Sequence, residues 1–172
     1  MHMLLRISYL ADHPEAIPVI QRWFEEEWAS YYGSGGPGDA ERDLWAYSSR
    51  GQLPVGLIAY YEGQLCGIAA LTAYSIRTHT HLGPWAAGLV LPPLRGRGVG
   101  SGLLHALEEV ARGLGYATMY CATATAMGLL ERHGWQCLER VIYEGKQLSI
   151  YHKALSHDAP PDAASAMRVP RR

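Results

Sequence analysis

The order of predicted elements places this chain in the α/β class, with a mixed sheet covered by helices. Segments with the alternation of strands are separated by segments with the 3.6-residue period of helices. Residues 53–61 and 64–73 flank the turn Glu62-Gly63, which is typical of a β-hairpin. A further apolar strand runs through a glycine-rich turn straight into a helix. The length of 172 residues suits a single domain, which we expect over residues 1–155.

The first half of the chain opens with a loosely alternating strand at residues 3–10. Asp12 then takes the position of a helix cap, with Pro14 in the first turn. The apolar residues that follow recur at helical spacing: Ile17, Ile20, Phe24, Trp28 and Tyr31. The glycine-rich run 33–38 ends this helix, and a weaker helix over 39–49 precedes the hairpin.

The second half begins with a strand at 85–91 that Pro92-Pro93 closes. The helix after the glycine turn extends to about Leu114, where Gly115 stops it. The later elements are a strand, a helix and a hairpin, at residues 116–122, 124–133, 135–143 and 147–154. From residue 156 onward the composition predicts a disordered tail, 156–172.

Composition excludes several classes of function. A net charge of −1 gives no support for nucleic-acid binding. No apolar run approaches the ~20 residues of a membrane-spanning helix, so we expect no membrane contact. The first residues lack the layout of a signal peptide, and a cytoplasmic location is the default expectation. The widely spaced Cys66, Cys121 and Cys137 are interpreted as buried thiols, without bridges or zinc.

The turn between the strand at 85–91 and its helix has the chemistry of a phosphate site. Its glycines fall at every second position from 96 to 102, which lets backbone N–H groups approach a ligand. The following helix adds free N–H groups and the positive end of its dipole. Arg95 and Arg97 supply full positive charges. We therefore expect a pyrophosphate to bind here.

The spacing of the glycines distinguishes between kinds of pyrophosphate site. The phosphate loop of nucleotide hydrolases needs a Lys after its glycines, and the dinucleotide fingerprint needs Gly-x-Gly-x-x-Gly; neither fits. Arg95-Gly96-Arg97-Gly98-Val99-Gly100 instead resembles the acetyl-CoA loop of the GNAT superfamily, Arg/Gln-x-x-Gly-x-Gly/Ala. One helix and one strand later, residues 129–135 are similar to the family's Tyr-Glu-Lys-x-Gly-Phe signature. The resemblance extends over residues 3–155 and implies an acetyltransferase with splayed central strands.

The resemblance also assigns the donor site. Backbone groups of Leu89, Val90 and Leu91 are expected to be unpaired and to hydrogen-bond the pantetheine arm of acetyl-CoA. The Val90 N–H would stabilise the oxyanion, and the amides of residues 96–102 would hold the pyrophosphate. The full set of expected donor-binding residues is Leu89, Val90, Leu91, Arg95, Gly96, Arg97, Gly98, Val99, Gly100, Ser101 and Gly102.

The acid and base are less well defined, because the usual acidic Tyr of the second signature is Leu130 here. Tyr120 is the candidate acid, with Tyr143 and the threonines at 123 and 125 as alternatives. A CoA thiolate can also leave without an acid. The candidate bases are His81, with His79 beside it, and Glu27. The two histidines have the spacing of a metal pair, yet no carboxylate stands near them in sequence, so no metal is expected.

These features predict an acetyl-CoA-dependent N-acetyltransferase that acts on the primary amine of a small molecule. The run Glu25-Glu26-Glu27 favours a cationic acceptor such as a polyamine or an aminoglycoside, although it also suits a solvated helix face. Four tryptophans are candidates for the wall of an acceptor cleft: Trp23, Trp28, Trp45 and Trp85. Two alternatives remain, a peptide or protein N-terminal acetyltransferase and a non-catalytic acyl-CoA sensor. Because dimers are common in the family, a homodimer is also considered.

Overall fold

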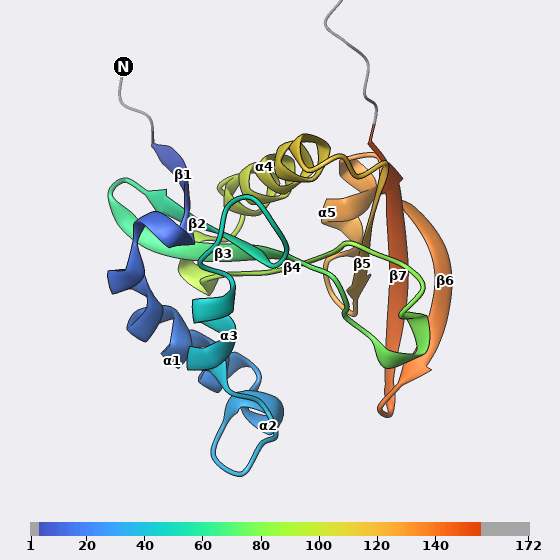
Figure 1. Ribbon diagram of the computed structural model, residues 1–172, viewed down its shortest axis with the longest axis horizontal. Coiled ribbons are helices and arrows are strands. Elements are labelled where there is room, and N and C mark those ends of the chain that lie inside the picture. Colours follow the sequence, from blue (N-terminus) through green and yellow to red (C-terminus); the bar gives the residue numbers. More distant parts are fainter. Residues whose placement is uncertain (1–3, 156–172) are drawn as a thin grey trace, which may run out of the picture.

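The computed structural model describes residues 4–155. A seven-stranded sheet in the order β1-β2-β3-β4-β5-β7-β6 forms the centre of the molecule (Figure 1). Its strands are β1 (Leu5–Tyr9), β2 (Val55–Tyr61), β3 (Gln64–Thr72), β4 (Trp85–Val90), β5 (Thr118–Thr123), β6 (Gln136–Tyr143) and β7 (Lys146–Ala154). The helices are α1 (Ile17–Glu27), α2 (Ala29–Tyr32), α3 (Ala40–Ala46), α4 (Val99–Gly113) and α5 (Met127–Arg132). Short 3₁₀ turns link them, at Leu10–Asp12, Pro14–Ala16, Arg77–His79 and Pro92–Leu94.

The sheet is mixed, as the sequence predicts, and most of its strand pairs are antiparallel. Strands β1 to β4 pair antiparallel with their neighbours, and so do β5, β7 and β6. The two groups meet in one parallel contact, where Trp85 of β4 pairs with Tyr120 of β5. Beyond that contact β4 and β5 diverge, so the central strands are splayed.

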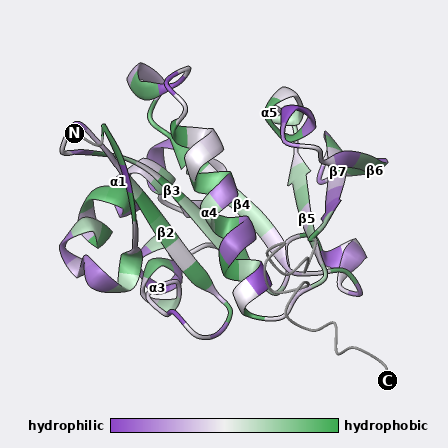
Figure 2. Ribbon diagram, turned by 90° about the horizontal axis from the view of Figure 1, so that it is seen from above, coloured by the Kyte–Doolittle hydropathy of each residue, from purple (hydrophilic) through white to green (hydrophobic). Residues whose placement is uncertain are grey.

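Helices cover both faces of the sheet because each buries one apolar stripe (Figures 1 and 2). Helix α4 packs over β1 to β4 and buries Leu103, Leu104 and Leu107. On the opposite face α1 and α3 bury Ile20, Phe24 and Leu44 against β2 and β3. Figure 2 shows green, hydrophobic segments of β2 and β3 in the middle of the sheet, beneath these layers.

The expected first helix is wrong at both ends. Asp12 belongs to a 3₁₀ turn and pairs with Arg50, and no side chain caps α1, which begins at Ile17. At its other end α1 stops at Glu27, and Trp28 leaves the helical conformation (φ −120°, ψ 53°) before α2 begins. Trp28 was expected to face the core and is instead 36% exposed. The break turns this ring toward the sheet near β4.

Other expectations differ in detail. The weak helix over 39–49 is α3, and the Asp39 carboxylate caps it by accepting a hydrogen bond from the Arg42 N–H at 3.0 Å. Of the three cysteines expected to be buried, Cys66 is buried and Cys121 is partly buried, but Cys137 is exposed because it lies on the edge strand β6. All three are free thiols. The predicted tail at 156–172 lies outside the described residues.

Candidate active site

The turn between β4 and α4 adopts a conformation that its glycines make possible. Gly96 and Gly98 have positive φ angles of 77° and 84°, in the region that side chains with a Cβ avoid. Gly98 is the residue before α4, so the first free N–H groups of the helix follow directly after it. The exposed turn therefore presents backbone donors at the positive end of a 15-residue helix.

The two arginines of the turn lie at its surface and lean in different directions. Arg95 donates from Nε to the carbonyl oxygen of Val90 at 3.0 Å. The guanidinium of Arg97 lies 5.7 Å from the ring centroid of Tyr61. Gly102 differs from the other glycines of the turn, because a Cβ there would lie 2.6 Å from Leu5 Cδ2. Gly102 is therefore needed for the close packing of α4 on β1, where a side chain would clash.

The second signature, at residues 129–135, lies against the first, as the resemblance implies. His133 Nε2 is 2.9 Å from Ser101 Oγ in the first turn of α4. A Cβ on Gly100 would lie 3.4 Å from Leu129 Cδ2. Leu130, at the position of the usual acid, is only 2% exposed and belongs to the core. Helix α5 thus borders the glycine turn. Residue 130 supplies no general acid there, because it is a buried leucine.

Strand β4 exposes an unpaired edge beside this turn. The Leu91 N–H donates to the Cys66 carbonyl at 2.9 Å, so Leu91 faces β3. Because partners alternate along an antiparallel ladder, Leu89, which pairs with Ile68, faces β3 as well. The backbone groups of Gly88 and Val90 then face the other way, toward β5. In the described chain β5 pairs with β4 only at Trp85, so these groups border a gap.

The expectation for the edge of β4 is therefore corrected. Leu89 faces β3 and not the gap. Leu91 does not have free backbone groups either, since its N–H is bound to β3 and its carbonyl accepts from Leu94. Val90 does face the gap, with its carbonyl engaged by Arg95. Gly88 faces the gap too and is missing from the sequence assignment, because the side-chain pattern of a strand does not reveal which residues hydrogen-bond to which neighbour.

The three candidate catalytic residues come from separate elements. Tyr120 lies at the point where β4 and β5 part, with its ring 5.6 Å from Trp85 and 6.5 Å from His152. His81 is exposed in the loop before β4, and its ring lies 5.8 Å from that of His79. Glu27 is exposed at the end of α1. Tyr120 thus lies at the gap between β4 and β5. His81 and Glu27 lie on other elements and do not border the gap.

The alternatives to these residues mostly have structural partners. Thr123 caps the start of α5, accepting from the N–H groups of Thr125 and Ala126. The Tyr143 hydroxyl accepts from the Arg77 N–H at 3.3 Å. His79 is not a solvated loop residue, because its Nε2 lies 2.9 Å from Glu139 Oε2. Among residues 4–155, no group of three His, Cys, Asp or Glu side chains is arranged to hold a metal ion.

A small cavity of about 30 Å³ opens beside the free edge of β4. Three aromatic side chains from the helical face line it, and the remaining lining belongs to β3 and β4. The full lining is Phe24, Trp28, Tyr47, Ile68, Ala69, Ala70, Ala87 and Gly88. It has room for about one water-sized group. Of the tryptophans expected to wall an acceptor cleft, Trp28 lines it, whereas Trp85 is fully buried and donates to the Leu82 carbonyl.

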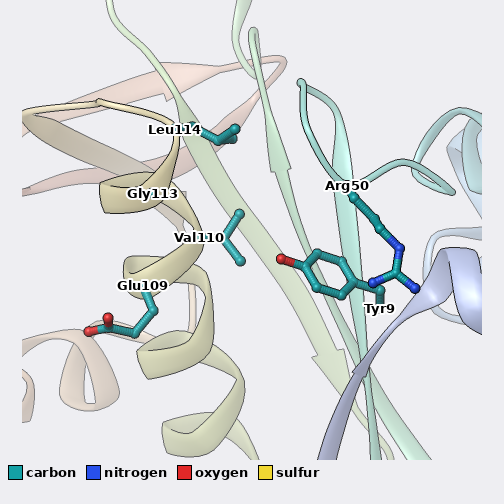
Figure 3. Close-up of a pocket in the computed structure, with 6 residues that line it drawn as sticks. All are labelled: Tyr9, Arg50, Glu109, Val110, Gly113 and Leu114. Carbon is teal, nitrogen blue, oxygen red and sulfur yellow. The ribbon is translucent and has the colours of Figure 1, made fainter.

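A larger cleft, of about 340 Å³, lies at the far end of α4 (Figure 3). Figure 3 shows the Tyr9 ring between Arg50 and Val110, with Glu109 directed away from the cleft. The charged groups already have partners, since Arg50 pairs with Asp12 and Glu109 with Arg112. Helix α4 separates this cleft from the glycine turn by about 20 Å. The cleft is therefore not part of the candidate active site.

Comparison with known proteins agrees with this arrangement. An N-acetyltransferase from Staphylococcus aureus Mu50 is 17% identical, with a TM-score of 0.71 over 88% of this chain and 99% of that chain. An aminoglycoside 6'-N-acetyltransferase complexed with coenzyme A is 13% identical (TM-score 0.70; 90% and 99% covered). A ribosomal-protein-alanine N-acetyltransferase from Brucella melitensis is 22% identical (TM-score 0.64; 89% and 100% covered). At these identities the likeness is one of fold.

No curated protein sequence matches the chain. No helix within residues 4–155 has the length and apolar character needed to cross a membrane. The model of the acetyltransferase (GNAT) family matches residues 20–135, which include most of α1, all of α2 to α5, the glycine turn and the second signature. The chain belongs to the acetyltransferase (GNAT) family.

Proposed function

We propose that this member of the family transfers the acetyl group of acetyl-CoA to the primary amine of a small molecule, with polyamines and aminoglycosides as the first candidates. One observation carries the proposal. The free edge of β4 at Gly88 and Val90 has the glycine turn at one end and the aromatic cavity on its flank. A donor along that edge and an amine in that cavity would meet at the same strand.

The residues of the donor side fit acetyl-CoA, the acetyl donor of this family. The amides of the turn and of the first turn of α4 would hold the pyrophosphate, assisted by Arg95 and Arg97. The backbone groups of Gly88 and Val90 would take the place of a neighbouring strand for the pantetheine arm, because unpaired strand groups need partners. For Arg95 this requires that its Nε leave the Val90 carbonyl.

Transfer requires that a C–N bond forms while the C–S bond of the thioester breaks. The Val90 N–H, on the free edge, would stabilise negative charge on the carbonyl oxygen. The attacking amine must lose a proton, for which His81 and Glu27 are the proposed bases; because neither contacts the gap, the proton would reach them through water. The leaving sulfur takes up a proton, which we assign to the Tyr120 hydroxyl at the point where β4 and β5 part.

The acceptor remains the open part of the proposal. The fold shared with an aminoglycoside 6'-N-acetyltransferase supports a small cationic amine. The fold shared with a ribosomal-protein-alanine N-acetyltransferase supports the alternative of a peptide N-terminus. The cavity beside Gly88 is small and closed by Phe24, Trp28 and Tyr47, which favours a slender amine over a folded protein end.

Two measurements test the proposal. Calorimetric titration with acetyl-CoA should show saturable binding, and the absence of binding at high micromolar concentration would refute it. A thiol-release assay across aminoglycosides, polyamines, amino acids and short peptides then identifies the acceptor class. Turnover confined to peptides would replace the small-molecule proposal with the N-terminal one. Tight donor binding with no turnover of any amine would instead indicate an acyl-CoA sensor.

A further inference from the structure

The helical segment beside the cavity, which we call the helical lobe, is much more acidic than the rest of the chain. Residues 24–47, from the end of α1 through α3, hold six carboxylates and one arginine, a net charge of −5. The whole chain has a net charge of only −1. The acids are Glu25, Glu26, Glu27, Asp39, Glu41 and Asp43, and the base is Arg42. A cleft walled by this lobe concentrates cations and repels anions.

Within the lobe four aromatic rings pack together around the cavity; we call them the aromatic cluster: Phe24, Trp28, Tyr32 and Tyr47. The Phe24 centroid lies 5.1 Å from that of Trp28 and 5.5 Å from that of Tyr32. Trp28 and Tyr32 are 6.3 Å apart. Three members of the cluster line the cavity, and Tyr32 stacks on one of these three, Phe24. Faces of aromatic rings attract cations placed over them.

Asp43 is the carboxylate that belongs to this cluster. The Tyr32 hydroxyl donates to Asp43 Oδ2 at 2.8 Å. The cavity-lining Tyr47 directly follows α3 in helical conformation, four residues after Asp43, so the two lie on one face of the helix. Burial and the nearby Asp43 carboxylate raise the pKa of Tyr47, which agrees with their proximity.

The second oxygen of Asp43 is only weakly engaged. Its Oδ1 lies 3.7 Å from Arg42 Nε, and the Arg42 side chain is largely exposed. The Asp43 side chain itself is 25% exposed, so a ligand can reach it while most of its surface is shielded from water. A charge in this position acts more strongly than one on the open surface.

We propose that Asp43 and the aromatic cluster form an anchoring subsite for a second ammonium group, which makes the acceptor a diamine or longer polyamine. This inference rests on the proposed function, because it places the reacting amine in the cavity at Gly88. The reacting nitrogen must be neutral when it attacks, so it cannot supply the charge that the lobe attracts. A second ammonium on the same molecule keeps its charge and binds between Asp43 and the exposed ring of Trp28.

The test compares 1,4-diaminobutane with 1-butylamine, which differ only in the second ammonium group. Wild-type protein should have a kcat/KM for the diamine about tenfold or more above that for the monoamine. Asp43→Asn keeps an oxygen for the Tyr32 hydroxyl and removes the charge; it should raise the KM for the diamine about tenfold and leave the monoamine unchanged. Calorimetry with 1,4-diaminobutane in the presence of CoA provides a second measurement that does not require turnover.

Two further variants complete the design. Glu41→Gln removes an exposed carboxylate of the same helix and should change either KM less than about twofold. Trp28→Leu keeps the charge but removes a ring that also lines the cavity of the reacting amine. It should therefore raise the KM of both amines, and that of the diamine by the larger factor, which covers the case in which Asp43→Asn does not fold. Equal effects of Asp43→Asn and Glu41→Gln, or equal use of both amines by wild-type protein, would overturn the subsite while the proposed function stands. Diamine binding that depends on Asp43 without acetylation would uphold the subsite and refute the proposed function. Absence of both binding and turnover would overturn both.

Discussion

Individual glycines of the turn have different roles although the sequence repeats them evenly. Gly98 is required by its backbone, since its φ of 84° strains any residue with a Cβ. Gly100 has ordinary helical geometry, and a Cβ there meets only the side chain of Leu129 at 3.4 Å. A substitution at Gly100 therefore changes the donor side of the site with little backbone strain.

We expect Gly100→Asp to abolish acetyl-CoA binding, because it adds bulk and negative charge where the pyrophosphate would lie. The fold should persist, since a carboxylate in the first turn of a helix interacts favourably with the helix dipole. Calorimetry measures the loss, and Gly100→Ala is the matched control that should retain binding. Gly98→Asp should also abolish binding, with added strain. Retained binding in Gly100→Asp would place the donor elsewhere.

Tyr120 provides a test of the proton chemistry. Its ring packs against Trp85 and His152, contacts that phenylalanine preserves. We expect Tyr120→Phe to lower kcat about a hundredfold while acetyl-CoA binding is unchanged, as for the loss of a general acid. Tyr143→Phe is the control, since that hydroxyl is engaged by Arg77. Equal kcat values in Tyr120→Phe and wild type would mean that the thiolate leaves without an acid.

At the scale of elements, strand β4 differs between its two edges. Leu89 and Leu91 are bound to β3, whereas Gly88 and Val90 face the gap. Amide hydrogen exchange reports this difference directly, because unpaired N–H groups exchange faster than paired ones.

We therefore expect the Gly88 and Val90 amides to exchange faster than the Leu89 amide between them. Adding acetyl-CoA should slow exchange at Gly88 and Val90 and leave Leu89 nearly unchanged. Residue-resolved hydrogen exchange by NMR is the measurement. Uniform protection along β4 before the donor is added would contradict the assigned edge.

Periodicity predicts elements well where the signal is local. The hairpin at β2 and β3, the strand-turn-helix at β4 and α4, and the last hairpin all lie where the sequence predicts them. The break after Glu27 was not predictable, because Trp28 and Tyr31 continue the helical spacing. The break coincides with a tertiary contact, since Trp28 lines a cavity together with Ala87 and Gly88 of β4. The spacing of residues within the helix does not reveal contacts with a distant strand.

The same distinction explains the candidate site. The predicted donor-binding turn, Arg95 to Gly102, lies within one continuous segment, so the sequence motif is enough to propose it. The acceptor cavity joins Phe24, Tyr47 and Gly88, which are far apart in sequence and meet only in the fold. Glu139 likewise reaches His79 from a distant strand, which the sequence gives no means to foresee.

At the scale of the whole molecule, several links hold the two groups of strands together. One is the pairing of Trp85 with Tyr120. Another is Glu108 of α4, which is 2% exposed and lies 2.5 Å from Lys153 Nζ on β7. The Trp135 ring N–H also donates to Glu108, at 3.3 Å. Because α4 packs on β1 to β4, this ion pair connects both groups.

Removing one partner of this pair should destabilise the fold. We expect Lys153→Met to lower the free energy of unfolding by about 3 kcal/mol, since it leaves a buried carboxylate without its counter-ion. Urea denaturation measures the change. The double variant Glu108→Leu/Lys153→Met should recover most of the loss, because it removes the uncompensated charge as well. A loss below about 1 kcal/mol in Lys153→Met would show that the pair is solvated.

We expect the bond from Arg95 to the Val90 carbonyl to protect the protein before it meets its donor. A strand edge with free backbone groups is a template on which another chain can pair and aggregate. Arg95 covers that edge with a bulky charge at the end nearest the glycine turn. A newly made molecule is thus guarded against pairing with its own copies by an arginine of its donor loop.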